Sequence, residues 1–227
     1  MGNNKRDALA FGLPANVTFA ILPNKPLSTT FSERAAGQQR EVMLHMPMES
    51  LSGNNLEKSV LLSSMRPQQI IETLKTALST VPHAVGVNNH MGSRLTQLTL
   101  HMSVTMKFLS EQGLYFVDSR TTRFSKAESI ARKSGVLSIK RNVFLDHTAN
   151  HEQIDKQFKR LLRLSKKYGF AVGIGHPYPE TLKYLKAHLG NLSEHSIELV
   201  KLSDLISTDA KLAFQQNPKP DTNTTAL

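Results

Sequence analysis

Residues 84–94 read AVGVNNHMGSR, and this stretch is the best guide in the sequence to the fold and its site. A short apolar run at residues 84–87 breaks off into Asn88, Asn89, His90 and Gly92. Asparagine and histidine bind ions and hydrogen-bond ligands, but they do not form a hydrophobic core. In parallel α/β folds, functional groups gather at the carboxyl ends of the strands. The stretch therefore indicates a strand that ends at a functional site; the alternative is that the asparagines only build a turn.

The same pattern continues along the chain, where short apolar runs alternate with segments of helical period. Candidate strands lie at residues 17–22, 42–45, 84–87, 114–117, 136–139, 143–145, 170–174 and 197–200. Candidate helices lie at residues 67–81, 95–113, 150–169 and 179–189. Strands that are apolar on both faces predict a parallel sheet covered by helices. Seven or eight strands favour a (β/α) barrel, and an open doubly wound sheet is the alternative architecture.

The composition is that of an ordinary globular chain. Of its 227 residues, 39% are hydrophobic and 20% are charged, which suits one sizeable domain over residues 1–207. Residues 208–227 are polar and without period, so we expect a disordered tail. No apolar run approaches the roughly 18 residues that span a bilayer, and the first residues lack the apolar segment of a signal peptide. The sequence therefore predicts no transmembrane segment.

Cysteine is absent, and basic residues exceed acidic ones. Without cysteine, disulfides, thiolate catalysis and cysteine-ligated zinc are excluded, and a metal must be held by His, Asp or Glu. The formal net charge of +10 raises nucleic acid or another anionic polymer as a partner. However, the basic residues are scattered, and the cluster within residues 156–167 fits the solvated face of a helix. Because no nucleic-acid-binding motif accompanies the charge, we expect no nucleic-acid partner.

Histidines and aspartates recur at the ends of the apolar runs. His45, His90 and His176 each follow such a run, and Asp118 and Asp146 end two others. On a barrel, all five would face one cavity. Imidazoles and a carboxylate can hold a divalent ion and leave a position open for water, while a further carboxylate and histidine move protons. The set predicts metal-assisted hydrolysis, whereas motifs for a serine hydrolase, a phosphate-binding loop or a zincin are absent.

The segments that carry these residues resemble the divergent polysaccharide deacetylase family. They are, in order, LPANVTFAILPNKP, HMPM, VGVNNHMGS, LYFVDSRTT, IKRNVFLDH and VGIGHPYP, and the resemblance covers residues 2–206. It implies a distorted, seven-stranded (β/α) barrel. It also implies an enzyme that removes acetyl groups from a polysaccharide or oligosaccharide of the cell envelope with a divalent metal, for which zinc is the expected ion.

The resemblance also implies roles for single residues. His45 and His90 are similar to metal ligands, His176 to the general acid, and Asp118 to a catalytic carboxylate that orients or charges the site. The expected contacts to substrate come from Asn88, Asn89, Ser93, Arg120 and Asp146. Arg141 is a further candidate to grip an anionic saccharide, and a solvated role is the alternative for both arginines.

One part of the family pattern is not found in the sequence. The family opens with an apolar strand that ends in Asp-Asp-x-Gly, and Met1-Gly2 stands where x-Gly is expected. We therefore expect a barrel that lacks its first strand, and a metal that binds weakly or not at all. The resemblance further implies a periplasmic location for the full-length protein. Two rival interpretations are a non-catalytic envelope protein that binds glycan or a partner through the same rim, and a nucleic-acid binder.

Overall fold

The structure, a computed structural model, describes residues 1–53 and 59–207. Its strands are β1 (Phe19–Ile21), β2 (Val42–Met48), β3 (Ala84–Met91), β4 (Tyr115–Asp118), β5 (Ser138–Lys140), β6 (Val143–Phe144) and β7 (Gly173–Ile174). Its α-helices are α1 (Ser28–Gly37), α2 (Pro67–Ser79), α3 (Thr99–Glu111), α4 (Ala127–Lys133), α5 (His151–Tyr168) and α6 (Pro179–His188). Three 3₁₀ helices complete the described elements: η1 (Lys5–Gly12), η2 (Leu95–Gln97) and η3 (Leu189–His195).

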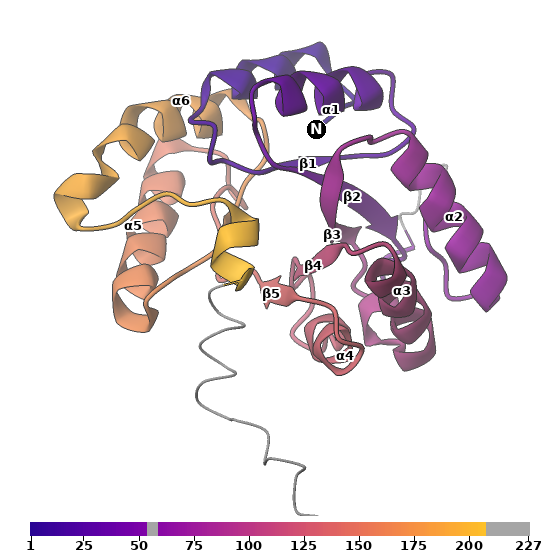
Figure 1. Cartoon of the computed structure of the whole chain (residues 1–227). Coiled ribbons are helices and arrows are strands. Elements are labelled where there is room, and N and C mark those ends of the chain that lie inside the picture. Colours follow the sequence, from indigo (N-terminus) through magenta and orange to yellow (C-terminus); the bar gives the residue numbers. More distant parts are fainter. Residues whose placement is uncertain (54–58, 208–227) are drawn as a thin grey trace, which may run out of the picture.

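The strands form two parallel sheets. One sheet has five strands in the order β1-β2-β3-β4-β5, and the other pairs β6 with β7. Figure 1 shows α1 to α4 around the outside of the five-stranded sheet, with α5 and α6 in a separate group beside it. The α/β class and the parallel pairing are therefore confirmed.

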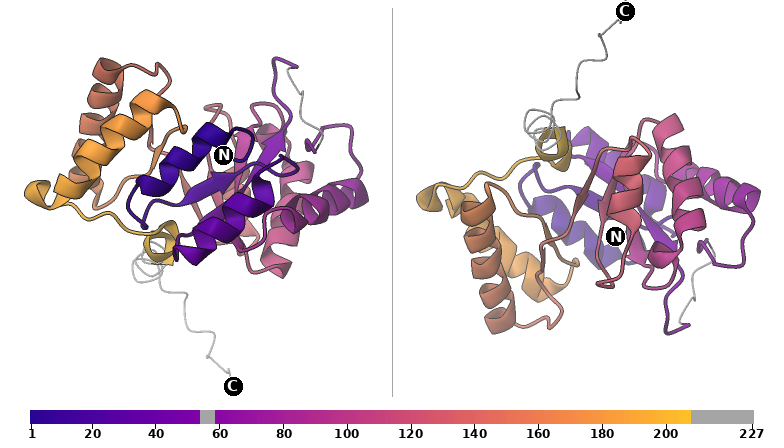
Figure 2. Two further views of the ribbon diagram at one scale, coloured as in Figure 1. Left: turned by 90° about the horizontal axis from the view of Figure 1, so that it is seen from above. Right: turned by 90° about the horizontal axis from the view of Figure 1, so that it is seen from below.

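The expected barrel of about seven strands is not what the described residues form. Their principal sheet has five strands, and β5 does not pair with β6, nor β7 with β1. Figure 2 shows the group of α5 and α6 set to one side of the larger sheet in both views. Residues 197–200, which we predicted as a strand, have no strand pairing in the structure. The predicted disordered tail, residues 208–227, lies outside the described part of the chain.

The backbone of Met1 lies along the outer edge of β1. Its amino group donates to the carbonyl of Ala20 at 2.9 Å, and its carbonyl accepts from the N–H of Leu22 at 2.9 Å. These two bonds are the pattern of a parallel ladder. Met1 therefore continues the order of the sheet by one residue on the side of β1 that faces away from β2.

Alternation along the strands separates two faces of the five-stranded sheet. Leu44 and Phe116 point outward into the core formed with the surrounding helices, while Met43 and Val117 point inward into a second core cluster. Because successive side chains of a strand point to opposite faces, His45 lies on the inward face with Met43. A third cluster joins β6 to α5 and α6 through Val143, Ile154 and Tyr184, among others.

A polar network around Glu41 joins the amino-terminal ends of β1, β2 and β4. The hydroxyl groups of Tyr115 and Thr18 donate to Oε1 of Glu41 at 2.8 and 2.9 Å. The ring of Tyr115 lies so close to Gly86 that a Cβ atom there would approach it to 2.3 Å. Gly86 is therefore required for β3 and β4 to pack side by side below the site.

Candidate active site

A cavity of about 1050 Å³ lies between the inward face of the five-stranded sheet and the group of β6, β7, α5 and α6. Three of the five predicted strand-end residues line it: His45 from β2, His90 from β3 and His176 from the turn after β7. The structure thus brings together histidines that are separated by up to 131 positions in the sequence. His45 lies in the middle of β2, His90 lies near the carboxyl end of β3, and His176 follows β7.

His45 and His90 form a directly contacting pair. Nε2 of His45 lies 3.0 Å from Nδ1 of His90, and the ring centroids are 4.7 Å apart. On its other side, Nδ1 of His45 lies 2.9 Å from the side-chain oxygen of Asn88. Since the amide oxygen only accepts, Nδ1–H of His45 donates to it, and the lone pair of Nε2 points toward His90.

Asn88 and Asn89 hold this arrangement from behind. The amide group of Asn88 donates to Oγ of Ser119 at 3.2 Å, which fixes the orientation of its oxygen toward His45. Oδ1 of Asn89 accepts the N–H of Ser119 at 2.8 Å. Both side chains are buried and line the cavity. They therefore connect β3 to β4 at the site, which goes beyond the building of a turn.

The environment of His45 disfavours its charged form. Burial is the largest cause that holds the pKa of His45 well below its usual value of 6.5, and the neighbouring His90, the chain's amino group and His176 act in the same direction. The hydrogen bond to Asn88 opposes them only in part. A neutral imidazole is the form that binds metal ions.

We expect this shift to appear in the pH dependence of stability. A group whose pKa is lower in the folded state adds stability above its unfolded pKa, near 6.5, and loses it as the pH falls through the folded value. The melting temperature should therefore drop below about pH 6.5, and the His45→Gln variant should flatten that drop. Thermal melts from pH 8 to 5 check this, with His195→Gln as the control at an exposed histidine. An imidazole resonance of His45 that titrates at or above 6.5 would contradict it.

His176 lies against a buried carboxylate. Its Nδ1 is 3.1 Å from Oδ1 of Asp146, whose side chain is fully buried, and its backbone N–H donates to Oδ2 at 2.6 Å. Oδ2 also accepts the hydroxyl of Thr181 at 2.8 Å. Because Nδ1–H donates to Asp146, Nε2 of His176 is left to face a ligand. Asp146, which we expected to contact substrate, instead orients His176.

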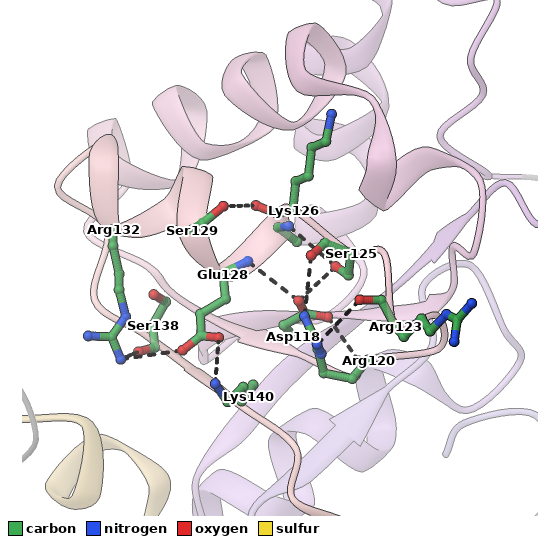
Figure 3. A network of polar contacts seen from close by, with 11 residues as sticks. Asp118, Arg120, Arg123, Ser125, Lys126, Glu128, Ser129, Arg132, Ser138 and Lys140 are labelled. Carbon is green, nitrogen blue, oxygen red and sulfur yellow. Dashed lines mark hydrogen bonds and ion pairs between the residues drawn. The ribbon is translucent and has the colours of Figure 1, made fainter.

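Asp118 lies elsewhere than we expected. It follows Phe116 on the outward face of β4, and it is not among the described residues that line the cavity. Its Oδ1 accepts the N–H of Arg120 at 2.8 Å, and its Oδ2 accepts Oγ of Ser125 at 2.7 Å and, more weakly, the N–H of Glu128. Figure 3 shows this carboxylate at the centre of the contacts that tie the loop after β4 to α4. Asp118 is therefore placed to shape the loop, and not to reach the histidines.

Of the remaining predicted substrate contacts, Arg120 lines the cavity and Ser93 does not. Ser93 is not among the described residues at the cavity, and its Oγ accepts the N–H of Leu51. Arg120 lines the cavity, as does Arg141, which was only a further candidate. His147 also lines it, although we assigned it no role; its position after the run VFLD was the available signal.

The residues present fit a metal ion only in part. Two nitrogens that each lie about 2.0–2.1 Å from one zinc ion are about 3.3 Å apart in a tetrahedral site, close to the 3.0 Å between His45 and His90. Asn88 supplies the orienting contact that metal-binding histidines usually have. However, residues 1–53 and 59–207 contain no group of three or more His, Asp or Glu side chains suited to hold a metal. Within the described residues, the histidine pair alone does not make up a metal site.

Two comparisons of the sequence place the chain among known proteins. The family described as divergent polysaccharide deacetylase matches residues 1–206. An uncharacterized protein of Haemophilus influenzae is 38% identical over 201 residues, which cover 88% of this chain and 71% of that protein. The uncharacterized protein YibQ of Escherichia coli is 36% identical over 222 residues, or 98% of this chain and 66% of that protein. This chain therefore spans about two thirds of the length of these relatives.

Solved structures share its fold. The uncharacterized protein ATU2773 of Agrobacterium tumefaciens superposes with a TM-score of 0.87 at 22% identity, covering 90% of this chain and 85% of that one. A lactam utilization protein of Thermus thermophilus gives a TM-score of 0.59 at 13% identity, covering 86% and 92%. At these identities the likeness concerns the fold alone. The match over residues 1–206 and the two sequence relatives show that the chain belongs to the divergent polysaccharide deacetylase family.

Proposed function

We propose that the protein removes acetyl groups from a carbohydrate by metal-dependent hydrolysis. The observation that carries the proposal is the convergence of His45, His90 and His176 on one cavity, with Asp146 behind His176. Family membership supports the carbohydrate substrate. Acyl hydrolysis requires one group that activates the attacking water and another that transfers a proton to the leaving group. In this proposal the pair His45 and His90 serves the first step, and His176, which is oriented separately, serves the second.

His176 is the proton donor in this proposal. Asp146 holds Nδ1–H, so the imidazole presents Nε2 to the cavity, where it can give a proton to the departing oxygen or nitrogen of the sugar. The backbone N–H of His176 and the hydroxyl of Thr181 occupy the other oxygen of Asp146 and keep the carboxylate in place.

His45 and His90 are the proposed ligands of a divalent ion, for which we expect zinc. Such an ion, when bound, supplies a Lewis acid for the acetyl carbonyl and lowers the pKa of bound water. Asn88 contributes by fixing the tautomer and direction of His45. The ligand set in this proposal is completed by a carboxylate placed next to the histidine pair.

A second candidate function is non-catalytic binding of glycan through the same rim. The incomplete ligand set among the described residues favours it, because two imidazoles alone hold a metal weakly. An extracytoplasmic location, inferred from the family resemblance, belongs to both proposals. None of the helices in the described ranges is long and apolar enough to cross a membrane.

Acetate release tests the proposal. The purified protein is incubated with acetylated cell-wall oligosaccharides and with added zinc, cobalt or manganese, and acetate is measured over time. We expect release that depends on metal and stops with a chelator. Saccharide binding with no acetate release under any metal would favour the non-catalytic candidate.

A further inference from the structure

We propose that Arg120 and Arg141 form an anion subsite of the cavity, and that the saccharide bound there carries a carboxylate. The inference rests on the proposed function and names the class of its substrate: an acetylated acidic saccharide. Both arginines are among the residues that line the cavity with His45, His90 and His176.

The contacts of Arg141 leave part of its donor set for a ligand. Its Nε donates to the carbonyl of Ser119 at 2.7 Å, and one Nη donates to the carbonyl of Arg120 at 2.8 Å. The partners of its guanidinium are backbone carbonyls, and the described residues place no carboxylate within ion-pair distance. Arg141 therefore stands as a fixed positive charge with its second Nη group unused.

The charge of Arg141 is also partly removed from water. Burial lowers the pKa of Arg141 and is the largest cause, the charge of Asp118 opposes that shift, and the charges of Arg120 and Arg160 act in the same direction as burial. Its guanidinium carbon lies 5.4 Å from the centre of the Phe144 ring, which also lines the cavity. Because Nε and one N–H of an Nη group are already engaged, the remaining N–H groups at the Nη end of this half-buried cation are left for a planar anion, and a carboxylate can accept two parallel N–H bonds there.

Arg120 is the second arginine of the proposed subsite, and its backbone has an unusual conformation. Its φ of +49° lies in the left-handed region, which costs energy for a residue with a side chain. The buried carboxylate of Asp118 holds that conformation by accepting the N–H of Arg120 at 2.8 Å. The guanidinium of Arg120 makes only long contacts, at 3.3 and 3.5 Å, to the carbonyls of Ser125 and Arg123. Asp118 is therefore a positioning residue of the subsite.

The loop offers a matched control. Arg123 belongs to the same loop, is exposed, and stacks on Phe124 at 4.7 Å from the ring centre. In Figure 3 its guanidinium extends away from Asp118 and Arg120, and Arg123 is not among the described residues at the cavity. Removing the charge of Arg123 tests for general electrostatic attraction, whereas removing the charge of Arg120 or Arg141 tests the subsite.

Binding is measured by calorimetry with two acetylated oligosaccharides of one backbone: one with a uronic carboxylate, the other with that group reduced to an alcohol. We expect the acidic form to bind more tightly, with an advantage that Arg141→Gln and Arg120→Gln each reduce by roughly 10–100-fold. Arg123→Gln should change it little, and neither of the two cavity variants should change binding of the neutral form. Arg141→Lys keeps the charge but loses the fork, so it should recover only part of the advantage.

The outcomes separate this proposal from the proposed function. Equal binding of both oligosaccharides, or an equal loss in all three Gln variants, would overturn the subsite. Tighter binding of a sulfated or phosphorylated analogue than of the carboxylate form would overturn the carboxylate assignment. If the carboxylate advantage follows Arg120 and Arg141 but no acetate is released, the subsite stands and the hydrolase proposal fails. Circular dichroism and thermal melts verify that each variant is folded. If Arg141→Gln does not fold, Arg120→Gln still tests the subsite, because the long contacts of the Arg120 guanidinium contribute little to the fold.

Discussion

The His176→Ala variant is expected to lower the turnover of acetyl release by roughly 10²–10⁴-fold, the usual contribution of a positioned general acid. The measurement requires a form of the protein that binds its metal. Because Nδ1 of His176 is engaged by Asp146 and the paired nitrogens belong to His45 and His90, the variant should keep the metal content of the parent.

Two further variants sharpen this result. Asp146→Asn should lower turnover in the same direction, because an amide can accept from Nδ1–H but cannot provide the same charge. His147→Ala removes another imidazole from the same cavity and should have little effect. If His176→Ala instead loses the metal with its activity, His176 is a ligand, and the roles of the three histidines must be exchanged.

The sequence predicted the elements that have strong periodicity. The four helices read from their apolar spacing correspond to α2, α3, α5 and α6. His45, His90 and His176 do line one cavity, although β2 and β3 run past His45 and His90 to Met48 and Met91. Helices with weak local signals were missed. α1 has the sequence STTFSERAAG, without a side-chain cap, and α4 has only seven residues. Their helical form depends on packing against the sheet, which local propensity does not report.

Asp118 shows why the sequence predicts only some of the residues at the site. Strands of a parallel sheet are apolar on both faces, so the run YFVD does not reveal which of its side chains point inward. The position of Phe116 in the outer core settles the question only once the fold is known, and it places Asp118 on the helix side. The same limit applies to Asp146, whose pairing with His176 joins positions 30 residues apart.

The number of strands expected to join one closed sheet was too high for a related reason. Eight apolar runs were counted as strands, but residues 197–200 do not pair, and β6 and β7 have two residues each. Whether such strands join a closed sheet depends on the neighbours at its edges. Here β2 pairs with one edge of β1, Met1 lies along the other edge, and the described residues do not bridge β1 to β7.

That edge leads to the second large effect, on metal affinity. We expect residues 1–227 to bind zinc weakly, because the ligands that we propose among the described residues are only the pair His45 and His90. Met1 lines the same cavity, and its amino group is close enough for its charge to lower the pKa of His45. Side chains attached directly before Met1 would therefore enter the region of the histidine pair.

An engineered extension tests this placement. Adding Asp-Asp directly before Met1 should strengthen zinc binding by more than roughly 100-fold, since even the outer partners of a ligand are worth about 10–100-fold. It also replaces a buried ammonium, which repels a cation, with a carboxylate ligand. Asn-Asn before Met1 is the matched control, and it should give only the small gain from removing the charged amine.

Zinc affinity is measured by competition with a chromophoric chelator, independently of activity. His45→Ala in the Asp-Asp form should lose the gain, which shows that the new carboxylate and the imidazole hold the same ion. Equal affinity of the Asp-Asp and Asn-Asn forms would contradict the placement of the third ligand beside Met1. Tight binding by residues 1–227 without an extension would contradict the incomplete ligand set itself, because an ion held by two imidazoles alone lacks the charge and the geometry that tight zinc sites require.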